Sequence, residues 1–477
     1  MPFPPLDPAM PATDIAALTA RDLIDLFRRK AVSPVEVARD ALARIEKFEP
    51  AINAFVRVEA EAALDDARDA EARWMKGSPL GPADGLPVTI KDNVDVAGVP
   101  SRKGSRTTPD IPAAADAPSV AWLREAGAVF LGKTTLPEWG WIGVCHSPLT
   151  GITRNPWHRD RTTGGSSGGA AAAALLNLGV MHLGTDGAGS IRIPAAFTGV
   201  FGIKPSYGRV PAWPASPFGV LAHQGPLTRT VGDAALMLSV IGGPDLRDST
   251  AWNTPAPDFT AGLEDGVRGL RVAWSPRLGY VKQLDADVEA ATAKAAQVFS
   301  ELGAKVEEVD PGFAEPIGIL DAIWYGVSAS IVDAVPAARR GEMDEGLRRM
   351  AEQGARVTLA EFLAAQARRA ELYRHMLRFH ERYDLLLTPQ MPLAAFEAGR
   401  VTPAGGRFGD EWIGWSPYTY PFNLTGQPAA SVPCGFSADG LPIALQIVGP
   451  PRQDALVLRA ARAFETARPF KSLREPK

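Results

Sequence analysis

Residues 162–205 read TTGGSSGGAAAAALLNLGVMHLGTDGAGSIRIPAAFTGVFGIKP, and this stretch decides the fold. It holds two short loops rich in glycine and serine, one around Ser166 and one ending at Ser190. The apolar runs between the loops predict a helix over 170–178 and a strand over 180–183. Purely flexible loops are uncommon between buried elements, so we interpret both loops as functional.

The same alternation of strands and helices continues on both sides of this stretch. Short apolar runs predict further strands at 86–90, 128–131, 270–273, 383–387 and 443–448. Helical spacing predicts helices at 119–125, 288–302 and 455–465. Strands separated by helices indicate an α/β fold whose central sheet is twisted, mixed and mostly parallel, with helices on both faces.

The chain is expected to form one large domain over 1–477. Ser33, Pro34 and Glu36 provide an N-cap, a first-turn proline and a capping box, which predict a helix to about Phe48. No stretch loses its apolar periodicity for long enough to be a linker. We expect a mostly helical lead-in at 1–76, a catalytic core at 86–250, a variable region shaping the substrate site at 251–430, and a closing strand and helix at 431–477.

Composition excludes several classes of protein. The 477 residues are 46% hydrophobic and 22% charged, which is typical of a globular chain with a large core. A net charge of −4, with acids and bases mixed, argues against a nucleic-acid groove. Two cysteines are too few for a disulfide framework, and neither a signal segment nor an apolar run of about 20 residues is visible. We therefore expect a cytoplasmic protein without nucleic-acid or membrane partners.

The two serine loops are suited to nucleophilic catalysis. Glycines around Ser166 and Ser167 let the backbone approach another group closely. Before Ser190, small residues leave consecutive N–H groups free to converge on one oxygen, as an oxyanion hole requires. A serine also needs a base, and Lys91 at the end of the apolar run 86–90 is a candidate. A buried lysine can be neutral near pH 7, although this segment alone favours an ordinary surface lysine.

These motifs together resemble those of the amidase signature family, in order and over nearly the whole chain. The segments that carry the resemblance are 90–92, 131–134, 153–157, 164–169, 184–192, 201–205, 423–428 and 431–435. The resemblance implies hydrolysis of carboxamide C–N bonds to an acid plus ammonia or an amine, through an acyl-enzyme and without a metal or organic cofactor.

The resemblance also implies a role for individual residues. Ser190 would be the nucleophile, Ser166 a bridging serine on a cis peptide bond, and Lys91 the base. The expected oxyanion hole consists of the N–H groups of Gly187, Ala188, Gly189 and Ser190, and the supporting residues are Ser167, Asp186 and Arg192. Position 188 is more often glycine in this family, so we expect a narrower pocket floor here.

Three alternatives compete with this interpretation. Residues 164–168 also fit the nucleophile elbow of an α/β-hydrolase esterase with Ser166 and a histidine, but that motif needs a strand directly before it. Residues 127–134 formally match a phosphate-binding loop, but they are apolar and strand-like. A glutaminase subunit of an amidotransferase shares the scaffold. Such subunits should show Met-Asp-Glu-Phe at 136–139 and an acid near Ser416, and this chain shows neither.

Aromatic residues offer a clue to the substrate. Eleven tryptophans are many for this length. Candidates for the substrate pocket are Trp139, Trp141, Trp213, Trp324, Trp412, Trp415, Tyr418 and Phe422. Aromatic residues are more often core than pocket, so the preference for an apolar or aryl-bearing amide rests on a small basis. The expected partner is a small amide, with a homodimer left open.

Overall fold

The computed structural model describes residues 15–471 and 473. Its strands are β1 (Phe55–Val58), β2 (Pro87–Lys91), β3 (Val129–Thr134), β4 (His146–Ser147), β5 (Gly151–Ile152), β6 (Arg154–Asn155), β7 (His158–Thr162), β8 (Met181–Asp186), β9 (Phe201–Lys204), β10 (His223–Thr228), β11 (Arg271–Trp274), β12 (Lys305–Glu308), β13 (Leu385–Pro389), β14 (Ala429–Phe436) and β15 (Pro442–Val448).

Helices alternate with these strands along the chain. The α-helices are α1 (Ala20–Arg29), α2 (Pro34–Ile52), α3 (Ala60–Lys76), α4 (Pro118–Glu125), α5 (Gly168–Leu175), α6 (Arg192–Thr198), α7 (Val231–Ile241), α8 (Ala286–Glu301), α9 (Ile317–Asp333), α10 (Glu345–Gly354), α11 (Leu359–Arg382), α12 (Pro421–Leu424) and α13 (Asp454–Ala467). Short 3-10 helices are η1 (Ile15–Ala17), η2 (Glu138–Gly140), η3 (Gly219–Leu221), η4 (Ala337–Glu342) and η5 (Trp412–Trp415).

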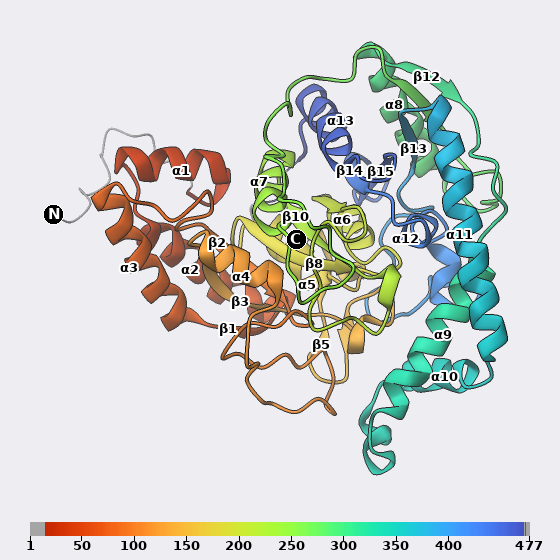
Figure 1. Cartoon of the computed structure of the whole chain (residues 1–477), viewed down its shortest axis with the longest axis horizontal. Coiled ribbons are helices and arrows are strands. Elements are labelled where there is room, and N and C mark those ends of the chain that lie inside the picture. Colours follow the sequence, from red (N-terminus) through yellow and green to blue (C-terminus); the bar gives the residue numbers. More distant parts are fainter. Residues whose placement is uncertain (1–14, 472, 474–477) are drawn as a thin grey trace.

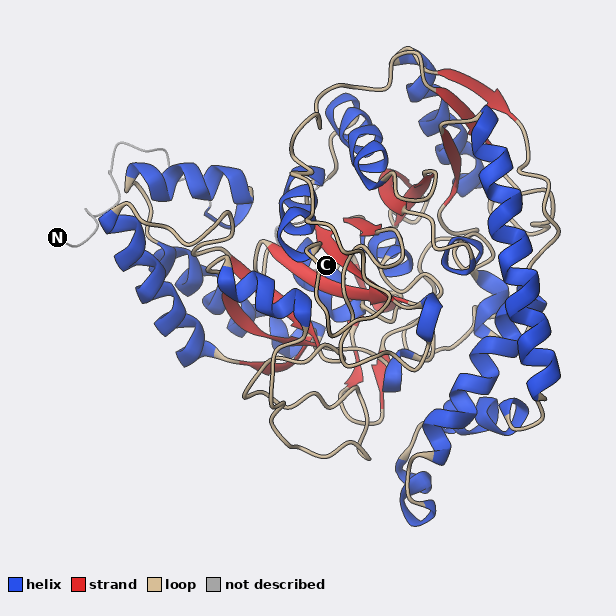
Figure 2. Cartoon of the chain, viewed as in Figure 1, coloured by secondary structure: helices blue, strands red, loops and turns tan. Residues whose placement is uncertain are grey.

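One sheet of eleven strands runs through the described part of the chain, with helices around it (Figure 2). Its order is β1-β3-β2-β8-β10-β9-β14-β15-β13-β11-β12. Figure 1 shows α1–α3 at one end of the molecule and α9–α11 at the opposite end. The expected single-domain α/β fold is confirmed.

The sheet is mixed, and its two kinds of pairing occupy different parts. Parallel pairs join β3–β2–β8 and β13–β11–β12, whereas β1 and the strands from β8 to β13 pair antiparallel. Antiparallel pairing is therefore more extensive than a mostly parallel sheet implies. The reason is that β9 and β10, and β14 and β15, follow each other without an α-helix between them, which permits antiparallel neighbours.

Alternate side chains along each strand pack on opposite faces of the sheet. In β13, Leu385 and Leu387 join a core with α7, α8 and α13, whereas Leu386 joins a core with α5, α6 and α9. This alternation is the consequence of the two-residue repeat of a strand. Apolar runs such as 383–387 belong to strands buried on both faces.

The predicted elements agree with the structure to within a few residues. Helix α2 begins after the Ser33 N-cap with the expected capping box to Glu36, and it continues to Ile52. Residues 127–134, the formal match to a phosphate-binding loop, contribute strand β3. Among the described helices, none combines the length and the apolar character needed to cross a bilayer.

Candidate active site

Lys91 lies at the end of β2, beside the parallel strand β8. Parallel pairing of Ile90 with Leu183 places the lysine next to Thr185 at the carboxyl ends of both strands. Its Nζ donates to Ser166 Oγ at 2.7 Å, to Ser167 Oγ at 2.8 Å and to Thr185 Oγ1 at 2.8 Å. The two serine loops and the lysine therefore meet, although up to 94 residues separate them along the chain.

Burial changes the acidity of this lysine. Lys91 is fully buried, and its desolvation lowers its pKa to about 7, against smaller opposing effects of Cys145 and Asp186. A charged ammonium loses its hydration in such a site, so the neutral form becomes accessible at physiological pH. Lys91 can thus act as a proton acceptor.

The loop that holds Ser166 is packed closely against its surroundings. The peptide bond between Gly165 and Ser166 is cis, as the resemblance implies. A Cβ on Gly165 would lie 2.3 Å from the carbonyl oxygen of Val144, so a side chain does not fit there. The next residue, Ser167, donates its N–H to the carbonyl oxygen of Ser190 at 3.0 Å, and its Oγ donates to Thr185 O at 3.0 Å. These bonds connect the two loops.

The Ser190 loop is organised by a buried ion pair between Asp186 and Arg192. Both Asp186 oxygens accept from Arg192, at 3.0 Å each, and Asn423 donates to Oδ1 at 2.8 Å. Burial alone would raise the pKa of Asp186, but the Arg192 guanidinium holds it well below its usual range. Arg192 also donates to Thr419 O and to Gln446. The supporting residues predicted from the resemblance are therefore in contact with one another.

The expected oxyanion hole needs one correction. The N–H of Gly189 donates to Asp186 Oδ1 at 2.7 Å, so this group is already used inside the loop. Within the described residues no hydrogen bond is recorded for the N–H groups of Gly187, Ala188 and Ser190. The set of free donors is therefore three groups.

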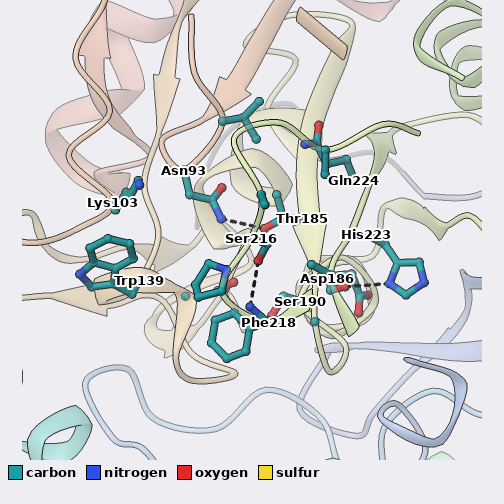
Figure 3. A pocket seen from close by; sticks show the side chains of 18 of the residues that line it. Asn93, Lys103, Trp139, Thr185, Asp186, Ser190, Ser216, Phe218, His223 and Gln224 are labelled. Atoms are coloured by element: carbon teal, nitrogen blue, oxygen red, sulfur yellow. Dashed lines mark hydrogen bonds between the residues drawn. The ribbon is translucent and has the colours of Figure 1, made fainter. Parts of the chain in front are cut away.

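A pocket opens beside the two serines. Ser166, Thr185, Gly187 and Ser190 line it together with residues from the loops 93–103 and 212–224. Figure 3 shows Trp139 and Lys103 on one side of this pocket and Asp186 and His223 on the other. The Lys103 ammonium lies 4.5 Å from the centre of the Trp139 ring.

Trp139 and Trp324 are the predicted aromatic residues that line this pocket. The other candidates, Trp141, Trp213, Trp412, Trp415, Tyr418 and Phe422, lie outside its lining. Trp415 stacks on Phe197 in the core, and the Tyr418 hydroxyl donates to Pro276 O. Their positions follow from packing between distant segments, which sequence spacing does not reveal.

Several lining residues were not anticipated. They are Asn93, Lys103, Thr185, Phe218, His223 and Gln224. Asn93 donates to Thr185 Oγ1 at 3.1 Å and follows Lys91 closely in sequence, so it was the easiest of these to find. Phe218 follows a segment with three prolines at 211–217, which indicates a loop but gives no direction.

The histidines do not support the esterase alternative. His182 bonds Thr89, His223 bonds Leu221 O, His375 bonds Pro311 O, and His380 bonds Tyr383 O. Ser166 instead accepts from Lys91. Strand β7, which precedes the Ser166 loop, pairs with β6 in a separate small sheet and not in the central sheet that a nucleophile elbow requires.

Comparisons with known proteins agree with this site. The Amidase family model matches residues 36–458. An acylamidase of Rhodococcus erythropolis is 38% identical over 459 residues, which cover 95% of this chain and 96% of the relative. A glutamyl-tRNA(Gln) amidotransferase subunit of Myxococcus xanthus is 36% identical, covering 95% of this chain and 98% of its own.

Solved structures give the same answer. A bacterial aryl acylamidase of the amidase signature family is similar with a TM-score of 0.87 and 34% identity, covering 95% of this chain and 96% of its own. The 6-aminohexanoate cyclic dimer hydrolase is similar with a TM-score of 0.85 and 30% identity, covering 96% and 98%. This chain belongs to the amidase signature family and hydrolyses amide C–N bonds.

Proposed function

We propose that Ser190 attacks the amide carbonyl while Ser166 and Lys91 carry its proton. Neutral Lys91 accepts the proton of Ser166, which accepts that of Ser190 as the Ser190 oxygen bonds to the carbonyl carbon. The contact that supports this relay is the 2.7 Å hydrogen bond from Lys91 Nζ to Ser166 Oγ. The proton then returns through Ser166 to the leaving nitrogen, and ammonia or an amine departs. Water cleaves the acyl-enzyme by the same relay.

The negative charge on the tetrahedral intermediate needs donors that are already in place. The N–H groups of Gly187, Ala188 and Ser190 are the proposed oxyanion hole, and each such donor contributes about 3 kcal/mol in comparable sites. The Asp186–Arg192 pair fixes the loop through the N–H groups of Gly189 and Ile191. The loop therefore needs little rearrangement during the reaction.

Trapping of the acyl-enzyme tests this assignment. The purified protein is mixed with an activated amide, quenched in acid, digested and analysed by mass spectrometry. We expect an acyl adduct on Ser190, and we expect Ser190→Ala to keep its circular dichroism spectrum while losing turnover. An adduct on Ser166, or turnover in Ser190→Ala, would refute the proposal.

We propose an amide with an aryl or apolar group as the substrate. Trp139, Phe218 and Trp324 line the pocket, and apolar walls of this kind bury an apolar ligand group. An acylamidase and an aryl acylamidase among the similar proteins also support this class. The measurement is kcat/KM for p-nitroacetanilide against acetamide, read as product release. Equal values would remove the preference.

A glutaminase subunit of an amidotransferase is the second candidate. Relatives that belong to amidotransferases, with 36% identity, support it. The Ser416 hydroxyl donates to Ile413 O, so this position offers no carboxylate to a glutamine amino group. Ammonia release from glutamine by the protein alone, compared with release from simple amides, distinguishes the two candidates.

A cytoplasmic location and a homodimer stay predictions. The mixed surface charge and the scarcity of cysteines support the cytoplasm. Cell fractionation tests the location, and light scattering of the purified protein tests the assembly.

A further inference from the structure

Trp324 of α9 separates two hollows of the molecule. On one side it lines the active-site pocket, where a Cβ added to Gly187 would lie 3.2 Å from its Cζ3 atom. On the other side it lines a narrow recess that also includes Asp321, Tyr325 and Glu411. Trp324 is only 3% exposed. The indole is thus a partition that contacts the proposed oxyanion loop directly.

The indole is held in this position from several directions. Its Nε1 donates to Trp141 O at 3.2 Å. Its ring centre lies 4.2 Å from that of Phe218 and 5.5 Å from that of Trp412. Figure 3 shows Phe218 on the floor of the pocket close to Ser190, so this contact joins the partition to the reacting centre. A side chain with these contacts has little freedom to move aside for a substrate.

The recess behind Trp324 has acidic chemistry. Asp321 and Glu411 line it, and no lysine or arginine is among its described lining residues. Burial, with Glu411 and Glu315 nearby, raises the pKa of Asp321 to about 6. At pH 8 this group is still a carboxylate. Space opened on this side would favour a cationic group over a neutral one.

We propose that Trp324 is a specificity-determining residue that limits the length of the substrate arm lying against Gly187. The indole ends the pocket on this side and closes off the acidic recess, so the wild-type enzyme accepts compact groups there. Shortening residue 324 opens a subsite suited to a chain that ends in an ammonium group. The inference rests on the proposed Ser190 chemistry and adds a substrate limit to it.

The test compares long with short substrates in two series at pH 8. One series varies the acyl group of p-nitroanilides from acetyl to hexanoyl and 6-aminohexanoyl. The other keeps the acetyl group and varies the amine from methyl to hexyl and 6-aminohexyl. The readout is the ratio of kcat/KM for long over short members. In one series we expect Trp324→Ala to raise this ratio at least about tenfold, because the end wall is removed.

The charge of the recess gives a second readout. In Trp324→Ala we expect the ammonium-ended chain to exceed the methyl-ended chain of the same length about threefold or more. Adding Asp321→Asn should remove this advantage. An unchanged advantage in the double variant would contradict the proposed role of Asp321.

Matched variants separate the partition from general damage. Trp122→Ala removes an indole from α4, packed against Gly243, and should leave the long-to-short ratio as in the wild type. Trp324→Phe is the milder variant, and should raise the ratio less than Trp324→Ala. If Trp324→Ala does not fold, Trp324→Phe decides: a ratio within about twofold of wild type in both series overturns the proposal.

The proposed chemistry and the proposed limit fail in different ways. Turnover in Ser190→Ala would refute the chemistry. Loss of turnover in Ser190→Ala, combined with unchanged long-to-short ratios in folded residue-324 variants, would refute the limit alone.

Discussion

The Ser190 loop and the wall of the pocket are built by different forces. The loop is fixed by charged hydrogen bonds, in which Asp186 and Arg192 are both fully buried. The wall consists of packed rings, including Phe218 on Trp324, contributed by a loop and by α9. The first kind of contact fixes atoms in direction as well as in distance, whereas apolar packing is not directional.

This difference assigns the two regions different tasks. The proposed attack of Ser190 needs donors and a base at fixed angles, and the directional bonds provide them. Selection of a substrate needs shape, which packed rings provide and which can change without loss of the chemistry. Changes in the loop should therefore affect kcat and folding, and changes in the wall should affect the choice of substrate.

Replacing the proposed base should have the largest effect. Lys91→Met keeps a chain of similar length but removes the proton acceptor beside Ser166, so kcat should fall about 10³- to 10⁴-fold. Steady-state turnover of the wild-type substrate measures this loss. Lys204→Met is the matched control, because Lys204 is also fully buried but donates to Gln427 O. A smaller loss from Lys91→Met than from Lys204→Met would contradict the assigned role.

Breaking the buried ion pair should mainly destabilise the protein. Arg192→Met leaves the Asp186 carboxylate buried without its cation, which should lower the free energy of unfolding by about 3–5 kcal/mol. Urea denaturation measures this change. The exposed pair of Arg28 and Asp25 provides the control, since Arg28→Met should cost less than about 1 kcal/mol. Equal costs for the two variants would show that the buried pair does not organise the loop.

The pH profile should follow Lys91. Its neutral form is the proposed base, and its pKa is lowered to about 7. As the pH falls below 7, the lysine becomes protonated and kcat/KM should decrease about tenfold per pH unit. The pKa of Asp186 lies well below this window, so that group stays charged throughout. A flat profile between pH 5 and 8 would exclude Lys91 as the titrating group (the range follows from its pKa near 7).

A change in the wall should have the smallest effect on the reaction itself. Phe218→Ala removes one ring of the pocket, so KM for an aryl amide should rise about two- to tenfold with a smaller change in kcat. Initial rates over a range of substrate concentrations separate the two constants. Leu363→Ala on the exposed face of α11 is the control and should leave KM unaffected. A loss in kcat alone would place Phe218 in the chemistry instead.

Local pattern was sufficient for many elements of the fold. Ser33, Pro34 and Glu36 predicted the start of α2 because a capping box is a local arrangement. The runs 86–90 and 443–448 predicted β2 and β15, because buried strands are continuously apolar. Strands β9, β10 and β14 were not among the predicted strands, and with them the antiparallel middle of the sheet was missed. Pairing between strands is a long-range choice that no short segment encodes.

The chain by itself determined the fold class, the family and the residues proposed for catalysis, because these depend on short motifs such as 164–169 and 184–192. Tertiary structure alone decided that Lys91 is buried against Ser166, that Gly189 N–H is used by Asp186, and that Trp139 and Trp324 face the pocket while Trp415 does not. The physical reason is that burial, hydrogen-bond partners and the direction of a side chain depend on neighbours that are distant along the chain, whereas backbone conformation and apolar periodicity are local.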